Sequence, residues 1–132
     1  MTVLTPLQKD IYSAKICPYC KSRTRITTET EIYGREYKKR AVICCKNFPL
    51  CDSYVGTHDD GTTLGRLANK ELRMWKKRAH DEFDKLWKTG NYDRDEAYEN
   101  LSDEIGIDLE YTHIGFFNVE TCKKVIHWAK SI

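Results

Sequence analysis

Six cysteines are the residues of this chain whose chemistry is easiest to specify. Two of them, Cys17 and Cys20, have a C-x-x-C spacing, with Pro18 and Tyr19 between them. This spacing allows a tight turn to present two sulfur atoms to one ion, and Zn²⁺ takes four ligands in a tetrahedron. A second cysteine pair is therefore needed to complete a zinc site.

The second pair must come from Cys44, Cys45 and Cys51. We predict Cys45 and Cys51, because the residues between them, 46–50, include turn formers. Cys44 would point to the opposite face of a strand that ends at Cys45, although the doubled cysteine leaves this choice open. The prediction is one structural zinc ion held by Cys17, Cys20, Cys45 and Cys51.

Paired cysteines also occur in disulfides and in redox sites. The start of the chain, Met1–Pro6, lacks the basic flank, apolar stretch and cleavage site of a secretory signal, so we expect a cytoplasmic protein with reduced thiols. No βαβ pattern surrounds the C-x-x-C spacing, as a thioredoxin-like site requires. The longest apolar run, Ala41–Cys45, is far shorter than the roughly 20 residues of a membrane span. These features favour zinc, and we expect no membrane contact.

The 24 residues between the two cysteine pairs predict a β-hairpin. Apolar and β-branched residues alternate with polar ones over 25–32, Gly34–Glu36 supplies a turn, and a return strand runs over 37–44. A third short strand is expected over 53–57. We therefore predict an α+β chain that begins, over residues 1–60, with a zinc ribbon of three short antiparallel strands. Zinc must hold this ribbon together, because so small a sheet buries little apolar area.

Residues 61–132 change to a helical period and predict a small lobe of three helices packed against the ribbon. The first helix ends at Thr89–Gly90, and its apolar stripe comprises Leu64, Leu67, Ala68, Leu72, Trp75, Ala79, Phe83 and Leu86. A second helix is expected over 93–105, where Gly106 ends it, and Asn118 caps a third. The core face of the third helix comprises Val119, Cys122, Val125, Ile126 and Ala129.

Charge is distributed unevenly along the chain. Residues 1–90 hold 18 Lys and Arg against 11 acidic residues, and residues 91–132 hold 4 against 9, although the formal net charge is only +2. Four thiolates with one Zn²⁺ add about −2 and bring the total near neutral. The sum does not indicate a polyanion binder, so a nucleic-acid surface would need cations clustered within the first 90 residues.

The four histidines form no recognised catalytic or metal-binding spacing. A second metal site built from His80, His113 and His127 would support a metal-dependent nuclease with Asp84 as an acidic neighbour. Structural histidines are the simpler interpretation. The chain also lacks a phosphate-binding glycine loop, a nucleophile elbow and a paired-carboxylate motif. These observations favour a protein without catalytic activity.

Two short stretches carry a resemblance to known zinc ribbons. They are Cys17-Pro18-Tyr19-Cys20 and Cys45-Lys46-Asn47-Phe48-Pro49-Leu50-Cys51. Both resemble the C-terminal zinc ribbons of bacterial type I topoisomerases, whose second pair reads C-x-N-Y-P-x-C. Lys21 departs from that pattern, since glycine is common after the second cysteine. This resemblance implies contacts with single-stranded DNA or with RNA polymerase.

A longer similarity extends over nearly the whole chain. It is carried by the segments Glu31–Arg35, Cys51–His58, Leu67–Arg73, Ala79-His80, Phe83–Lys88 and His113–Phe117. In these segments the chain is similar to a family of small phage and bacterial mobile-element proteins, described as zinc-finger-containing and of unknown function. The similarity implies a zinc site and carries no activity with it.

The leading hypothesis is a nucleic-acid-binding accessory protein, with single-stranded DNA as one candidate target. Its surface would combine cations that neutralise phosphates with aromatic rings that stack on bases. The cations are Lys21, Arg23, Arg25, Lys38, Lys39, Arg40 and Lys46, and the rings are Tyr19, Tyr37, Phe48 and Tyr54. The same rings would equally well cover a thin ribbon core.

The second hypothesis is a protein-interaction module that binds a host polymerase or defence component. The mixed charge and the exposed edge strand of the predicted ribbon motivate it. Such a module would use the ribbon edge or the helical lobe. The sequence pattern specifies no oligomeric state for either hypothesis.

Overall fold

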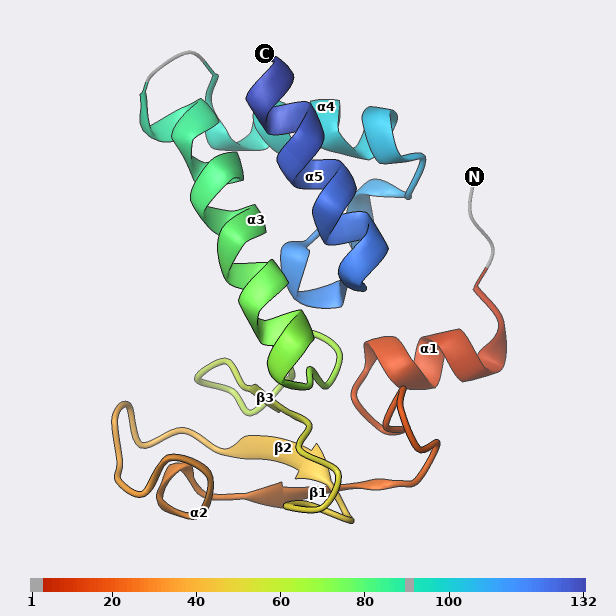
Figure 1. Ribbon diagram of the computed structural model, residues 1–132, viewed down its shortest axis with the longest axis vertical. Coiled ribbons are helices and arrows are strands. Elements are labelled where there is room, and N and C mark those ends of the chain that lie inside the picture. Colours follow the sequence, from red (N-terminus) through yellow and green to blue (C-terminus); the bar gives the residue numbers. More distant parts are fainter. Residues whose placement is uncertain (1–3, 90–91) are drawn as a thin grey trace. The chain divides into compact units, whose positions relative to one another are not determined.

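The computed structural model describes residues 4–89 and 92–132 (Figure 1). Contacts group these residues into two compact units, 4–70 and 71–132. The elements of the first unit are α1 (Pro6–Tyr12), β1 (Thr24–Thr27), α2 (Glu29–Tyr33), β2 (Val42–Cys45) and β3 (Tyr54–Gly56). The later elements are helices α3 (Lys70–Lys88), α4 (Arg94–Ile105) and α5 (Val119–Ser131), with short 3₁₀ turns at Leu109–Tyr111 and Ile114–Phe116.

The predicted fold class is confirmed. Three short antiparallel strands, with four cysteines gathered beside them, come before a lobe of three helices. The expected boundary after residue 60, and the packing of the helical lobe against the ribbon, stay predictions. Within the described part of the chain, no helix has both the length and the apolar character needed to cross a membrane.

The three strands form one sheet in the order β1-β2-β3. Cys44 of β2 lies opposite Arg25 of β1 and Tyr54 of β3, and Ile43 lies opposite Ile26. Because directly opposed residues share a face of the sheet, Arg25, Cys44 and Tyr54 lie on one face. The other face carries the core of this unit. That core comprises Ala14, Cys17, Cys45, Val55 and Leu67, with Ile43 and Cys51 packed against it.

The hairpin predicted over 25–44 is wrong in its middle. The second half of its first strand is the short helix α2, because Thr28 caps the helix by accepting the N–H of Glu31. Gly34 ends α2 in the left-handed region at φ 82°, so it is a helix C-cap and not a hairpin turn. The return strand accordingly begins at Val42 and not at residue 37.

A buried carboxylate organises the loop that replaces the early part of the return strand. The side chain of Glu29 accepts four successive backbone N–H groups at 2.7 to 3.4 Å, and the donors are Tyr37, Lys38, Lys39 and Arg40. Lys39 has a left-handed backbone at φ 57°, which helps neighbouring N–H groups to converge on one anion. Burial opposes ionisation, but the backbone bonds hold the pKa of Glu29 below its ordinary value. The ionised carboxylate therefore fixes this loop.

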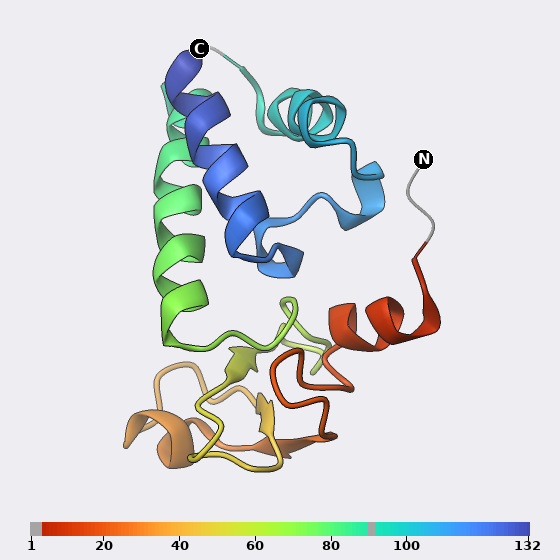
Figure 2. The ribbon, with the colours of Figure 1, turned by 45° about the vertical axis from the view of Figure 1, so that its right-hand side comes forward.

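In the helical unit, α3 and α5 lie side by side in both views (Figures 1 and 2). The ring of Phe83 in α3 lies 4.7 Å from that of Tyr98 in α4, measured between centroids, and both residues are buried. Asn118 caps α5 and Gly106 ends α4 at φ 70°, both as predicted, while Asp93, with which the second helix was expected to begin, is the N-cap of α4. Cys122 is fully buried on α5.

The first predicted helix begins later than its apolar stripe suggested. Leu64, Leu67 and Ala68 precede α3, and Ala68 forms an isolated bridge with Tyr54. Leu67 and Ala68 are buried within the first unit, whereas Leu64 is exposed. Leu67 and Ala68 therefore have a helical spacing in the sequence, but they pack in the first unit and not on a helix. Of the predicted stop signal, Gly90 lies outside the described residues.

We expect Glu29→Gln to lower the melting temperature of the zinc-loaded protein by several degrees at pH 7. All four N–H groups bond to Oε1, so a carboxamide oxygen can keep these partners, but the bonds lose the strength that a charged acceptor gives them. The NH₂ group of the carboxamide also replaces Oε2, which accepts a second contact from the N–H of Lys38 at 3.3 Å.

Glu31→Gln is the matched control for this substitution. Glu31 is on the same helix but is exposed, and its pair with Arg25, at 2.7 Å, contributes little in water. Its melting temperature is expected to stay close to that of the unmodified protein. Equal losses in the two variants, measured by circular dichroism, would show that the carboxylate of Glu29 has no special role.

Candidate metal centre

The first cysteine pair lies on a turn that follows α1. Cys17 donates its backbone N–H to Ser22 at 2.8 Å and accepts the N–H of Lys21 at 3.0 Å, which closes the turn. Ile16 and Arg23 form a bridge at its base. To fit this turn, Lys21 has a left-handed backbone at φ 61°. This conformation explains why glycine is common after the second cysteine of such turns.

The second pair is formed by the end of β2 and the turn after it. Cys45 ends β2, and its carbonyl accepts the N–H of Phe48 at 2.9 Å. Cys51 donates its backbone N–H to the carbonyl of Asn47 at 3.1 Å, so the five intervening residues form a tight loop. The N–H of Asn47 is also directed at the Cys45 sulfur, at 3.4 Å. The sheet and this loop together position both thiols.

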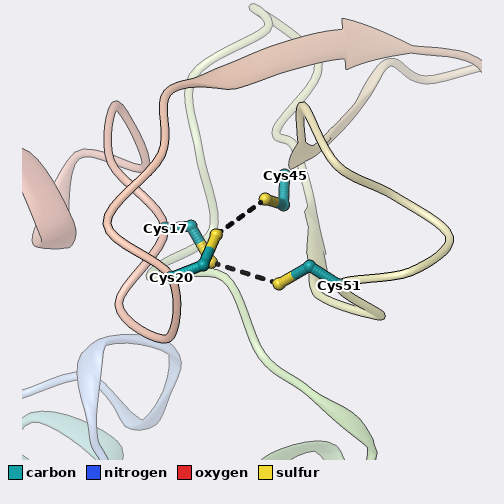
Figure 3. Close-up of side chains that lie close together, drawn as sticks. All are labelled: Cys17, Cys20, Cys45 and Cys51. Carbon is teal, nitrogen blue, oxygen red and sulfur yellow. Dashed lines mark hydrogen bonds between the residues drawn. The ribbon is translucent and has the colours of Figure 1, made fainter.

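The four thiols converge on one point, as Figure 3 shows. All four sulfur atoms lie within 4.8 Å of one another, with 3.6 Å between Cys17 and Cys51 and 3.3 Å between Cys20 and Cys45. In a zinc tetrahedron with Zn–S bonds of about 2.3 Å, the sulfur atoms are about 3.8 Å apart. The set of four thiols therefore fits one Zn²⁺ in donor type, number and spacing.

Polar groups around the sulfur atoms are suited to support thiolates. The hydroxyl of Ser53, a fully buried residue, lies 3.3 Å from the Cys17 sulfur and 3.4 Å from the Cys51 sulfur. The side-chain amide of Asn47 donates to Ser22 at 3.0 Å and lies 3.7 Å from the Cys20 sulfur. Such outer contacts orient metal ligands and share their negative charge.

The thiols differ in how readily they ionise. Hydrogen bonds, chiefly with Ser22, lower the pKa of Cys20 to about 6, whereas burial raises the pKa of Cys45 to about 12. Burial also raises the pKa of Cys51. Because burial raises the pKa of both Cys45 and Cys51, the cluster does not hold four negative charges at neutral pH by itself. A divalent cation supplies the missing stabilisation, and zinc binding then releases protons.

The comparison with known protein families agrees with this geometry. Residues 13–132 match the model of a family described as the zinc-finger-containing domain. The chain belongs to this family. Neither a curated protein nor a solved structure matches the chain. Family membership and the cysteine cluster together show a zinc-binding protein with one structural Zn²⁺, as the cysteine spacing predicted.

The two remaining cysteines of this zinc-finger protein lie elsewhere. Cys44 is fully buried on the face of β2 opposite to Cys45, and burial raises the pKa of its thiol. Cys122 lies in the helical unit. Among the residues that the structure describes, the only group of three or more candidate metal ligands is the set of four cysteines. The alternative of a second metal site at His80, His113 and His127 therefore has no support in the described residues.

The residues predicted to bind nucleic acid do not form one continuous group. Tyr37, Phe48 and Tyr54 belong to a row of neighbouring rings that is completed by Tyr33. The centroid distances along this row are 5.5 Å from Tyr37 to Tyr33, 5.7 Å from Tyr33 to Tyr54 and 6.1 Å from Tyr54 to Phe48. Tyr19 lies outside the row, and its hydroxyl accepts the backbone N–H of Asn69 at 3.0 Å.

The predicted cations also differ in their surroundings. Lys21 donates to the carbonyl of Pro18. Arg25 pairs with Glu31 at 2.7 Å and Arg40 pairs with Asp59 at 2.5 Å, so both are partly neutralised. The other four side chains are exposed: Arg23, Lys38, Lys39 and Lys46. A role in nucleic-acid binding stays a prediction for all of these residues.

Sequence reasoning missed Tyr33 and Glu29. Both lie on α2, which the alternating pattern had predicted as a strand. The signals that could have revealed α2 are Thr28 as a capping residue, acidic residues in the first turn and Gly34 after the last turn. With these signals taken into account, residues 29–33 would have been predicted as a helix, and Tyr33 would have been considered together with the other rings.

We expect Cys45→Ser to weaken zinc binding and Cys44→Ser to leave it unchanged. Losing one thiolate from the tetrahedron should weaken zinc binding by more than the ~10- to 100-fold typical of lost outer-sphere contacts. Cys44→Ser should keep one zinc per chain, because its sulfur lies on the other face of the sheet. Competition with a chromophoric chelator measures both affinities. If Cys44→Ser lost zinc and Cys45→Ser kept it, Cys44 would be the ligand and Cys45 would not.

The strain at Lys21 predicts a gain in stability on substitution by glycine. Lys21→Gly and Lys21→Ala remove the same side-chain contact with Pro18, but only glycine adopts the left-handed region without steric cost. We expect the glycine variant to be more stable than the alanine variant by about 1 kcal/mol. Urea unfolding of the zinc-loaded proteins measures the difference, and equal stability would contradict the assignment of strain.

Proposed function

We propose that this zinc-finger protein is a non-catalytic accessory factor of a phage or mobile element. We further propose that it binds single-stranded nucleic acid through residues 4–70, which we call the ribbon unit. The observation that carries the proposal is the row of four aromatic rings. Tyr33 and Tyr37 in this row are 42% and 57% exposed. Exposed rings beside cations provide the stacking and charge neutralisation that unpaired nucleic acid requires.

The charge distribution between the two units supports this proposal. Residues 4–70 contain 12 Lys and Arg against 7 acidic residues, whereas residues 71–132 contain 10 against 13. The excess of positive charge therefore belongs to the unit that carries the rings. Even with about −2 from four thiolates and one zinc ion, the ribbon unit stays positive.

Two cations, Arg23 and Lys46, hold opposed backbone positions where β1 begins and β2 ends. Lys46 donates its backbone N–H to the carbonyl of Arg23 at 3.1 Å, just beyond the paired residues Thr24 and Cys45. Like charges directly opposite in a sheet are destabilising. A phosphate between them would relieve that repulsion, and Lys46 is only two residues from Phe48 at the end of the ring row.

A second candidate is a protein-interaction module, and one observation favours it. Strand β1 is at an edge of the sheet, and its Ile26 is 75% exposed. An exposed apolar edge strand is suited to pair with a strand of another protein, such as a host polymerase. A host protein retained after nuclease treatment, and lost on Ile26→Lys, would favour this candidate over nucleic acid.

We expect the protein to bind a fluorescein-labelled 15-nucleotide single strand more tightly than a duplex of the same length. The slope of log affinity against log salt should fall by about 0.7 for each phosphate contact removed. Arg23→Glu with Lys46→Glu should therefore weaken binding and flatten the salt dependence. Fluorescence anisotropy between low and moderate salt measures both quantities.

The matched control is Lys124→Glu with Lys130→Glu. It changes the net charge by the same amount, but on exposed positions of α5 in the helical unit. Its affinity is expected to stay close to that of the unmodified protein. No binding of single strands at low salt, or equal losses in both double variants, would rule out a specific ribbon surface.

A further inference from the structure

A groove opens beside the ring row, within the ribbon unit. Its volume is about 450 Å³, and it lies among α2, the loop that follows it, β2 and the segment after β3. Its apolar walls include Tyr33, Tyr37, Val42 and Leu64, while Lys38 and Arg40 add two cations. This volume lies within the range of small-ligand sites, about 300 to 1,000 Å³, and it is large enough for a nucleobase with its sugar.

The two tyrosines meet almost at right angles. Their ring planes are inclined by 89°, and their centroids are 5.5 Å apart. One ring therefore offers a face for stacking while the other offers an edge to a planar guest. The guanidinium of Arg35 lies 4.5 Å from the Tyr37 centroid and adds positive charge near the groove. Such walls suit a flat aromatic guest.

The loop that carries Tyr37, Lys38 and Arg40 is held before any ligand arrives. Its backbone N–H groups are bound to the Glu29 carboxylate, which is 8% exposed and also lines the groove. Because these bonds engage the carboxylate, it is poorly placed to attract a cationic guest. Holding a binding loop in place reduces the entropy that binding must overcome.

Charge decides which class of guest fits. Lys38, together with Arg40, whose charge is partly offset by its pair with Asp59, disfavours an ammonium group such as that of a methylated lysine despite the aromatic walls. An acidic peptide would satisfy these cations but has no flat ring for Tyr33 and Tyr37. A nucleotide unit satisfies both requirements, because its base stacks and its phosphate pairs with the cations.

We propose that this groove receives one unpaired base of a single-stranded nucleic acid. One of the two rings, Tyr33 or Tyr37, stacks on the base while the other contacts its edge, and Lys38 and Arg40 lie where they can pair with the adjacent phosphates. The inference rests on the proposed function and adds to it a defined subsite. A base within a duplex is paired and stacked on its neighbours, so the groove explains a preference for single strands.

The test uses two substitutions in the groove and one outside it. Tyr37→Ala removes a stacking wall, and Leu64→Trp fills the groove from a side chain that is 44% exposed. Leu7→Trp adds the same indole on α1 at a position of similar exposure, 46%, and serves as the control. Zinc content of one ion per chain verifies that each variant is folded.

Affinity for a 15-nucleotide thymidine strand, measured by fluorescence anisotropy, is expected to fall in the two groove variants. Loss of one stacked base corresponds to about 5- to 100-fold. Leu7→Trp should bind like the unmodified protein, and Tyr37→Trp should recover most of the loss of Tyr37→Ala. Ultraviolet crosslinking of a bromodeoxyuridine strand should attach it to Tyr33 or Tyr37, as peptide mass spectrometry would show.

The outcomes separate this inference from the proposed function. If both groove variants bind as tightly as the unmodified protein while the Arg23 and Lys46 variant binds weakly, the ribbon binds single strands but the groove does not hold a base. If thymidine monophosphate binds as tightly as the strand, the groove is a small-molecule site and the inference is wrong. If the unmodified protein binds no single strand at low salt, both proposals fail together.

Discussion

The bonds between one zinc ion and four cysteine sulfurs are the interaction on which the ribbon unit depends. Its core cluster has only five buried residues, and two of them, Cys17 and Cys45, are zinc ligands. The remaining members, Ala14, Val55 and Leu67, form a small apolar cluster, and units of this size commonly rely on a structural metal for part of their stability. The metal therefore takes the place of a larger core and joins a turn after α1 to the end of β2.

Because the zinc site lies on one face of the sheet, the opposite face needs another means of stabilisation. There, Val42 and Cys44 are buried, and Tyr54 lies opposite Cys44 in the sheet register. Helix α2 brings Tyr33 to Tyr54, and the Glu29 carboxylate fixes the loop that follows. A sheet with strands of three or four residues is thus held by metal on one side and by rings and a buried carboxylate on the other.

Sequence patterns predicted the parts of this structure that depend on local chemistry. Cysteine spacing indicated the zinc ligands, and Asp93, Gly106 and Asn118 marked helix ends correctly, because a cap acts within one turn of its helix. The segment over 29–41 could not be predicted in the same way. Thr30 and Ile32 continue the strand-like alternation of Ile26 and Thr28 into it. The carboxylate that holds its loop acts on residues eight to eleven positions away.

The rings of the ribbon unit differ in how much they contribute to the stability of the fold. Tyr54 and Phe48 are only partly exposed, and Tyr54 lies over the sheet, so covering a thin core accounts for much of their burial. Tyr37 is 57% exposed and lies on a loop whose backbone is already fixed by Glu29. Its ring adds little to the core, yet it lines the groove with Lys38 and Arg40. A large ring kept at the surface by a preorganised loop is better explained by binding than by folding. On this reasoning the zinc site stabilises the fold, and the binding role proposed here belongs to the opposite face of the sheet.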